Sequence, residues 1–350
     1  MSILEDMDTI SVVIPAYNAE STLPLCLGSL KEQTVQPLEI LLVDDASTDD
    51  TASVARASGA ELVSFKERRG PAKARNTGAE KAEGSIVLFL DSDVVPPPDL
   101  LEKIAQRFAS DRAIVAVQTL YSPGCPADDM VSVYQNFYYF HALNRIKGNH
   151  TATFATWCAA VRKDSFMEIG GFNENIPEPT VEDEELGYSL VDSGRRIFLD
   201  RDIRVVHLAK YSLGQFIRRR YRMAKAQAKS GWRSVKNRLL LRYMNIRETG
   251  THHSRWVVLS IVLVLLACLL AGVFVFSLFS GTGRGGPFLT SALLLLALSL
   301  FLNIPFFSSG VSFFGWRILP GFLALWLLDM AVLGWGITVG TVQFVLGKNY

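Results

Sequence analysis

Short apolar runs alternate with more polar segments along the N-terminal part of the chain. The apolar runs cover residues 10–14, 39–43, 61–65, 85–90, 113–118 and 203–206. The segments between them, such as residues 19–33 and 49–58, carry Ser, Thr or Asp near their starts, which predicts helices that begin there. Strands that alternate with helices predict βαβ units, and therefore an α/β domain with a mostly parallel central sheet.

The C-terminal part has long apolar stretches and almost no charge. Residues 257–280, 288–309 and 320–346 each approach or exceed the roughly 20 residues that a helix needs to cross a bilayer. Buried helices of a soluble core are shorter and carry a polar face, so we predict about three transmembrane helices. Residues 311–319 are too short to span, and we expect a turn or short helix there at the membrane interface.

A block of positive charge precedes the first predicted span, although the net charge of the chain is only +1. Residues 218–247 include eleven Lys or Arg and no Asp or Glu. The positive-inside rule predicts an integral protein of the cytoplasmic membrane, with the N-terminal domain and Arg317 in the cytoplasm and the C-terminus outside. The predicted parts are a domain over residues 1–214, a basic interfacial helical segment over 215–255 and a membrane domain over 256–350.

The basic segment is expected to lie on anionic lipid headgroups, with Arg220, Arg222 and Lys225 as the contacts. Its position beside a span makes lipid the expected anion, so no nucleic-acid partner is predicted. The four cysteines have no metal-binding or redox spacing, which fits a reducing compartment. The acidic N-terminus has no apolar core, so no signal peptide is expected.

Two carboxylates follow the strand predicted over residues 86–90. Asp91 and Asp93 lie two positions apart, so in an extended chain they face the same way. Open α/β sheets bind ligands at the carboxyl ends of their strands, where Asp44 and Asp45 also follow a strand. Converging carboxylates repel unless a hard cation lies between them, which predicts Mg²⁺ or Mn²⁺ with phosphate groups. The alternative is a solvated, Asp-rich turn.

Six motifs between about residues 10 and 220 carry a resemblance to a known family. They are VVIPAYN at 12–18, VDDASTD at 43–49, KARNTG at 73–78, LDSD at 90–93, GGFN at 170–173 and EDEEL at 182–186. In this order and spacing the chain resembles family-2 glycosyltransferases with the GT-A fold. The resemblance implies an inverting, metal-dependent transfer of a sugar from a UDP- or GDP-sugar.

The resemblance also implies roles at the matched positions. The residues implied in donor nucleotide binding are Pro15, Tyr17, Asp44 or Asp45, Lys73, Arg75 and Asp91. A solvated helix face is the alternative for Lys73 and Arg75. Asp93 would bind the metal at the diphosphate, and Asp91 would contact the ribose or the metal. His207 would be a third metal ligand or an ordinary partly buried histidine.

An inverting transfer needs a carboxylate that takes the acceptor's proton. In the family's pattern the second acidic residue of EDEEL does this, which implies Asp183 as the catalytic base. Glu182, Trp157 and Cys158 fall where the family shapes the acceptor and sugar pocket. Trp157 would stack on a sugar ring, with a plain core tryptophan as the alternative.

The sequence QFIRR at residues 215–219 resembles the Gln-x-x-Arg-Trp signature of processive polysaccharide synthases, with Arg219 in place of Trp. Gln215, Arg218 and Arg219 are accordingly predicted at the donor diphosphate. The predicted function is transfer to a membrane lipid acceptor, namely polyprenyl phosphate, a lipid-linked oligosaccharide or a glycolipid. A processive synthase is the alternative, and a non-enzymatic scaffold is disfavoured by the retained Asp residues.

Overall fold

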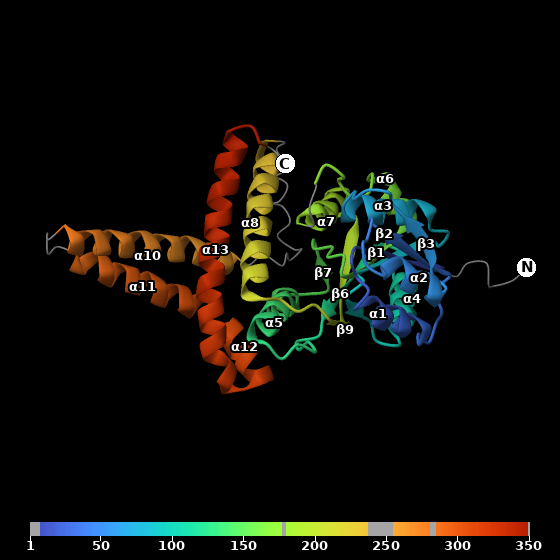
Figure 1. Cartoon of the computed structure of the whole chain (residues 1–350), viewed down its shortest axis with the longest axis horizontal. Coiled ribbons are helices and arrows are strands. Elements are labelled where there is room, and N and C mark those ends of the chain that lie inside the picture. The colour runs from blue at the N-terminus through green and yellow to red at the C-terminus, as the bar shows by residue number, and fades with distance from the viewer. Residues whose placement is uncertain (1–7, 177–179, 237–254, 281–284, 349–350) are drawn as a thin grey trace, which may run out of the picture.

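A mixed nine-stranded sheet forms the centre of the N-terminal domain (Figure 1). The computed structural model describes residues 8–176, 180–236, 255–280 and 285–348. Its strands are β1 Ile10–Ala16, β2 Glu39–Asp44, β3 Glu61–Ser64, β4 Ile86–Leu90, β5 Val94–Val95, β6 Ile114–Tyr121, β7 His150–Thr151, β8 Cys158–Arg162 and β9 Arg196–His207. Their order is β3-β2-β1-β4-β8-β6-β9-β5, and β7 pairs with β9.

The predicted α/β fold is confirmed. The sheet was predicted to be mostly parallel, and this holds for one half of it only. β3, β2, β1 and β4 are parallel neighbours, as the βαβ pattern predicts. β8 then runs antiparallel between β4 and β6. β6 and β9 are again parallel, while β5 and β7 pair antiparallel with β9, so the sheet is mixed.

Helices cover both faces of the sheet (Figure 1). They are α1 Leu23–Lys31, α2 Thr51–Ser58, α3 Pro71–Lys81, α4 Leu100–Ser110, α5 Met130–Asn144, α6 Lys163–Glu168 and α7 Glu182–Asp192. Along β1, Val12 and Ile14 belong to one buried apolar cluster and Val13 belongs to the other. This alternation explains why the central strands read as continuous apolar runs, since both of their faces are covered.

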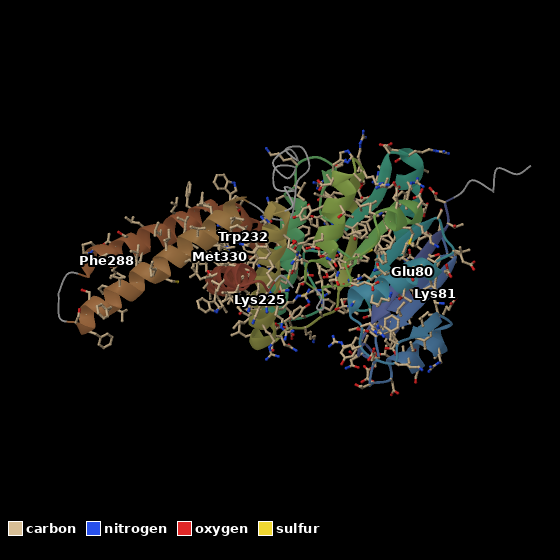
Figure 2. The ribbon with its side chains drawn as sticks, turned by 90° about the horizontal axis from the view of Figure 1, so that it is seen from above. Glu80, Lys81, Lys225, Trp232, Phe288 and Met330 are labelled. Atoms are coloured by element: carbon tan, nitrogen blue, oxygen red, sulfur yellow. The ribbon has the colours of Figure 1, made fainter. Side chains whose placement is uncertain are left out.

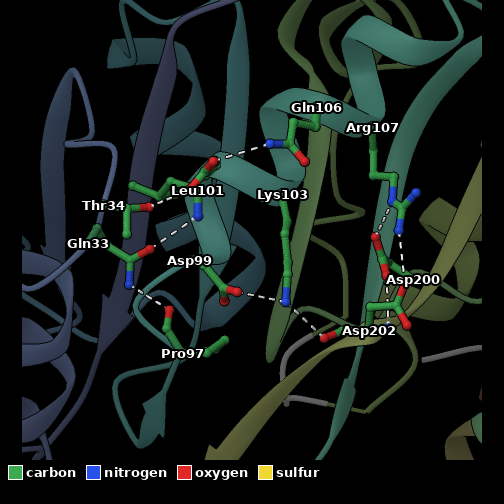
Figure 3. Close-up of polar contacts among 11 residues, drawn as sticks. Gln33, Thr34, Pro97, Asp99, Leu101, Lys103, Gln106, Arg107, Asp200 and Asp202 are labelled. Carbon is green, nitrogen blue, oxygen red and sulfur yellow. Dashed lines mark hydrogen bonds and ion pairs between the residues drawn. The ribbon is translucent and has the colours of Figure 1, made fainter.

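Polar contacts attach α4 to its surroundings (Figure 3). Gln33, which follows α1, donates to the Pro97 carbonyl at 2.8 Å and accepts from the Leu101 backbone N–H at 3.1 Å. Arg107 on α4 pairs with Asp200 at 2.5 Å and with Asp202 at 3.1 Å, both on β9. The Arg107 pairs hold α4 against β9, whose last residue is the predicted metal ligand His207.

The C-terminal helices are α8 Leu213–Lys236, α10 Arg255–Phe279, α11 Gly286–Leu302, α12 Ile304–Phe314, the short 3₁₀ helix η2 Trp316–Ile318, and α13 Leu319–Val345. Within the described residues, two helices are long and apolar enough to cross a membrane, at residues 256–279 and 316–345. The stretch predicted as one span over 288–309 is broken, because α11 and α12 meet at an angle of 57° beside Asn303 and Pro305. A proline in the first turn is compatible with the start of a new helix there.

A buried ion pair joins the basic segment to the last helix. Arg220 on α8 donates to both oxygens of Asp329 on α13, at 2.5 and 2.7 Å. Tyr134 of α5 donates to the same carboxylate at 3.1 Å, and the Arg220 guanidinium lies 4.3 Å from the Tyr138 ring centroid. Arg220 is 4% exposed. The prediction that Arg220 contacts lipid headgroups is therefore wrong, because its charge is already paired inside the protein.

We expect that removing one partner of this pair destabilises the protein strongly. Arg220→Met or Asp329→Leu should lower the free energy of unfolding by about 3–5 kcal/mol, because each leaves a buried charge uncompensated. The triple variant Arg220→Met/Asp329→Leu/Tyr134→Phe removes the polar partners together and should recover most of that loss. Thermal and denaturant unfolding in lipid nanodiscs measures both effects.

Lys103→Met serves as the control, because it removes a partly exposed i,i+4 pair with Asp99 and a hydrogen bond to the Asp202 carbonyl, and leaves no buried charge unpaired. Its effect should stay within about 1 kcal/mol. Equal losses in the control and in Asp329→Leu would contradict a special role for the buried pair.

Candidate active site

A cavity of about 130 Å³ opens beside the carboxyl end of β4. Its lining comes from distant parts of the sequence: Arg75, Asp91, Tyr121, Tyr139, Trp157, Glu182, Asp183, Glu184, His207, Tyr211, Arg219 and Met223, together with the 153–156 segment and Thr180. The structure thus brings predicted residues from six regions of the sequence together, namely Arg75, Asp91, Trp157, Glu182 with Asp183, His207 and Arg219. Because α8 contributes Arg219 and Met223, the basic segment forms one wall of the site.

The two strand-end carboxylates have different partners. Asp91 accepts from Arg75 Nη2 at 2.9 Å, whereas Asp93 Oδ2 lies 3.5 Å from His207 Nε2. Burial raises the pKa of Asp91 above its usual range, despite the lowering effect of Arg75. Burial acts on Asp93 in the same direction, but the hydrogen bond with His207 and the charge of Arg219 hold its pKa below the usual range. Asp93 is therefore the member of the pair that stays ionised most readily.

His207 lines the cavity, and Asp93 lies behind it at 3.5 Å without lining the cavity itself. Together they provide a nitrogen and an oxygen donor, which suits Mn²⁺ or Mg²⁺. In the described residues, no group of three or more His, Cys, Asp or Glu side chains is arranged to hold a metal ion. Asp91 is turned toward Arg75 instead. The arrangement suits a cation that takes two ligands from the protein. Its remaining ligands would be phosphate oxygens and water, which commonly coordinate such ions.

Four acidic residues begin α7, and three of them are bound by side chains from other elements. Glu182 accepts from Arg75 at 3.1 Å, Glu184 accepts from Gln227 at 2.8 Å, and Glu185 accepts from Ser230 at 2.7 Å and from Arg233. Asp183 accepts a hydrogen bond only from the Glu184 backbone N–H, counting the described residues. Asp183 is therefore the carboxylate of this group that remains available in the cavity.

The surroundings of Asp183 suit proton uptake. Burial raises its pKa well above the usual range, and the charges of Glu182 and Glu184 raise it further, while Arg75 opposes them. A carboxylate with a raised pKa is a stronger base than an ordinary one. Glu182 differs, because its carboxylate is held between Arg75 and the Thr180 backbone N–H. Glu182 therefore acts as a structural partner of Arg75 in this arrangement.

Polar loops follow β1 and β2 at the same sheet edge. Both oxygens of Asp45 accept backbone N–H groups, from Arg69 at 2.6 Å and Gly70 at 2.9 Å. Asp44 uses one oxygen for the Ser47 N–H, and its second oxygen has no hydrogen bond within the described part of the chain. Of the two candidates for base recognition, Asp44 thus retains the freer acceptor. Tyr17 is 41% exposed, with the Arg68 guanidinium 4.0 Å from its ring centroid.

Several predicted residues have partners or positions that the sequence did not indicate. Arg75 is buried and bridges Asp91 to Glu182, while Lys73 pairs with Glu174 at 3.2 Å. Gln215 accepts from the Ser212 N–H at 2.8 Å, and Ser212 Oγ accepts from the Gln215 N–H at 3.3 Å. This reciprocal pair is a capping box at the start of α8. The predicted site residues that do not line the cavity are Pro15, Tyr17, Asp44, Asp45, Lys73, Asp93, Cys158, Gln215 and Arg218.

Cys158, expected in the pocket, instead lies fully buried in the sheet, where burial raises its thiol pKa to about 12. It is the first residue of β8 and pairs with Leu90, so it is enclosed between neighbouring strands. Its neighbour Trp157 does line the cavity.

An aromatic wall, which sequence reasoning missed apart from Trp157 and His207, lines one side of the cavity. Tyr121 stacks on Trp157 at 4.4 Å and on His207 at 4.7 Å between ring centroids, and Tyr139 meets Trp157 edge-on at 5.7 Å. Trp157 Nε1 is buried without a hydrogen-bond partner among the described residues. The wall orients His207 toward Asp93, because stacking on Tyr121 fixes the plane of the imidazole. No local motif marks Tyr121 or Tyr139.

Comparisons with known proteins show what this chain is similar to. Residues 11–170 match the family model described as glycosyl transferase family 2. Glycosyltransferase GlyA of Streptococcus pneumoniae is 32% identical over 140 residues, which make up 39% of this chain and 19% of GlyA. Glycosyltransferase AglE of Haloferax volcanii is 26% identical over 230 residues, which make up 62% of this chain and 72% of AglE. The chain thus spans only a small part of GlyA and most of AglE.

A solved structure extends the likeness to nearly the whole chain. The mannosyltransferase PcManGT from Pyrobaculum calidifontis, in complex with GDP-Man and Mn²⁺, has a TM-score of 0.59 at 21% identity. The match covers 97% of this chain and 88% of that protein. At this level of identity the likeness concerns the fold, and it confirms the predicted GT-A architecture followed by C-terminal helices.

Proposed function

We propose that this protein is an inverting, metal-dependent glycosyltransferase that moves a sugar from a UDP- or GDP-sugar to a lipid acceptor at the cytoplasmic membrane, since residues 11–170 match the family model of glycosyl transferase family 2. The observation that carries the proposal is Asp183. It is the one carboxylate at the start of α7 that no described side chain binds, and it lies in the same cavity as Asp91 and His207.

The donor would lie along the carboxyl edge of the sheet. Asp44 would accept a hydrogen bond from the base, beside the exposed ring of Tyr17. The diphosphate would be placed between Asp93 and Arg219, with a divalent cation held by Asp93 and His207. That cation would neutralise the charge that develops on the departing nucleoside diphosphate. Arg219 would add a fixed positive charge on the opposite wall.

The acceptor would enter beside Asp183 and the aromatic wall. Asp183 would take the proton from an acceptor hydroxyl as that oxygen attacks the sugar from the face opposite the diphosphate. Trp157 Nε1, which lacks a partner among the described residues, would donate to a sugar oxygen. The carboxylates of Glu182, Asp183 and Glu184 would repel a second phosphate at this point. This favours an acceptor that presents a hydroxyl group, such as a lipid-linked oligosaccharide or a glycolipid, over polyprenyl phosphate.

A donor and acceptor panel tests the proposal. The purified full-length protein in nanodiscs is mixed with UDP- and GDP-sugars, and with glycolipid, lipid-linked oligosaccharide or polyprenyl phosphate. We expect release of nucleoside diphosphate and one lipid-linked product with a hydroxyl-bearing lipid. Product from polyprenyl phosphate alone would overturn the acceptor assignment, and extended polymer would favour the processive alternative. No release with any donor and acceptor would contradict the proposed activity.

A further inference from the structure

The last helix, α13, lies alongside α8 for most of its length. Gly336 and Gly340 allow this close approach, because a Cβ at Gly336 would lie 2.7 Å from Ala224 Cβ and a Cβ at Gly340 would lie 2.4 Å from the Lys225 carbonyl oxygen. Trp232 Nε1 donates to Thr341 Oγ1 at 3.1 Å near the far end of the pair. With the Arg220–Asp329 pair near one end and Trp232–Thr341 near the other, the two helices run in the same direction as one unit.

The other side of α8 faces the N-terminal domain with the candidate active site, which is called the catalytic domain below. Gln227 and Ser230 donate to Glu184 and Glu185 of α7, and Met223 lines the cavity. α8 is therefore a layer between the catalytic domain and α13, as Figure 1 shows. The positions of α8 and α13 relative to a membrane are thereby linked.

The hairpin of α10 and α11 has a different direction. It projects away from the catalytic domain, across the line of α13, with Phe288 near its far end and Met330, Lys225 and Trp232 near its junction with the other helices (Figures 1 and 2). It crosses α13 at Gly334, where a Cβ would lie 2.6 Å from Leu265 Cγ. If the hairpin spans the bilayer, α13 lies in the plane of the membrane.

The charges of α8 decide between the two orientations. α8 carries eight Lys or Arg residues and no acidic residue over Leu213–Lys236. If α13 crossed the bilayer, α8 would accompany it, and Arg222, Lys225 and Lys229 would reach the depth of the hydrocarbon core. Charged side chains are strongly disfavoured at that depth. The catalytic helix α7, which α8 contacts, would also have to enter the membrane.

We propose that α13, despite its length and apolar character, does not cross the membrane but binds the bilayer surface in the plane of the interface. Its partner surface is the headgroup and upper acyl layer of the leaflet that faces the catalytic domain. Only α10 and α11 cross, so the C-terminus lies on the same side as the catalytic domain. The sequence predicted three spans, with the C-terminus and the N-terminal domain on opposite sides of the membrane. The proposal differs because the hydrophobic pattern shows the length of each apolar helix and not which helix packs beside it.

The exposed face of α13 fits a lipid surface. Ala324, Trp335 and Val342 are exposed and lie on one side of the helix, since separations of 11 and 7 residues return to nearly the same direction. Trp335 is 62% and Val342 is 53% exposed, which in water would leave a large apolar stripe. Tryptophan is enriched at the membrane interface, where such a stripe can enter the upper acyl layer. This inference is independent of the chemistry proposed for the active site.

Side-specific cysteine labelling tests the topology in the full-length protein. Cys125 and Cys268 are first replaced by Ser and Ala, while Cys26 and Cys158 are buried and remain. Ala57→Cys marks the catalytic domain, Ser280→Cys marks the far end of α10, and Lys348→Cys marks the end of the described chain. All three positions are exposed.

With a membrane-impermeant maleimide and sealed vesicles of known orientation, Lys348→Cys should react from the same side as Ala57→Cys, and Ser280→Cys from the opposite side. Reaction of Lys348→Cys together with Ser280→Cys would show that α13 crosses, and would overturn the proposal. Reaction of all three from one side would show that the hairpin does not span, and would overturn it as well.

Spin labels at residues 324, 335 and 342 give a second, independent readout. These positions extend over about 27 Å of helix, close to the thickness of a bilayer core of about 30 Å. An in-plane helix places all three labels at similar, shallow depth by oxygen and nickel accessibility. A spanning helix would place residue 335 much deeper than one or both of the others, and that depth profile would contradict the proposal even if the labelling experiment were ambiguous.

Discussion

Asp183→Asn should retain donor binding while turnover falls by at least roughly 10²-fold, because a positioned general base contributes about 10² to 10⁴ in rate. The amide keeps the size and the hydrogen-bond acceptor that the Glu184 N–H uses, so the start of α7 should stay intact. Donor affinity measured by calorimetry and single-turnover transfer measured with the preferred acceptor separate the two effects. Asp128→Asn, an exposed carboxylate outside the cavity, is the matched control and should leave both unchanged.

Glu182→Gln distinguishes the two neighbouring carboxylates. Glu182 is bound by Arg75, so its loss should disturb the position of Arg75 without removing the base. Normal transfer by Asp183→Asn together with an inactive Glu182→Gln would identify Glu182, and not Asp183, as the catalytic base. Normal transfer by both variants would place the base outside this group.

The pH dependence supplies a test that a purely structural role would not pass. Burial and the charges of Glu182 and Glu184 raise the pKa of Asp183 well above its usual range. A base acts in its deprotonated form, so turnover should fall as the pH falls through that raised pKa. The acidic limb of the profile should therefore lie above about pH 3.9, the ordinary value for Asp, and should disappear in Asp183→Asn. An unchanged acidic limb in the variant would assign it to another group.

Asp93→Asn should lower transfer by at least roughly 10²-fold and weaken both donor and Mn²⁺ binding. A cation that neutralises the leaving diphosphate is worth several kcal/mol, and each 1.36 kcal/mol corresponds to tenfold in rate. Asp93 is the expected anchor, because its pKa lies below the usual range while that of Asp91 lies above it. Mn²⁺ titration followed by electron paramagnetic resonance, with donor present, measures metal binding independently of activity.

Asp91→Asn is the informative comparison. Asp91 is paired with Arg75, so this variant should affect Mn²⁺ affinity less than Asp93→Asn does. His207→Ala should resemble Asp93→Asn in metal binding, since the two side chains face each other at 3.5 Å. Full transfer in excess EDTA, or Mn²⁺ affinity that none of these variants changes, would contradict a catalytic metal at this site.

The elements of the N-terminal domain were largely readable from the sequence. Predicted strands at residues 10–14, 39–43, 61–65 and 85–90 correspond to β1, β2, β3 and β4, because continuous apolar runs are typical of strands covered on both faces. The pattern did not show the reversed direction of β8, since strand direction depends on how the chain crosses between strands. It also placed one continuous helix over 288–309, where Asn303 and Pro305 interrupt it.

The sequence by itself determined which candidate side chains follow which strands, because strand direction places Asp44, Asp91 and Asp93 at one edge of the sheet, and a local motif marks Asp183 as a candidate base. Only the tertiary structure decided which charges remain free. Arg75 is bound by Asp91 and Glu182, and Arg220 by Asp329, through contacts between residues 16, 107 and 109 positions apart. Pairing of charges depends on distance in space, and packing of α8 against α13 depends on shape complementarity at Gly336 and Gly340. The sequence pattern contains neither the distances between side chains nor the shapes of the helix surfaces. Which side chains remain available for catalysis is therefore decided only by the fold.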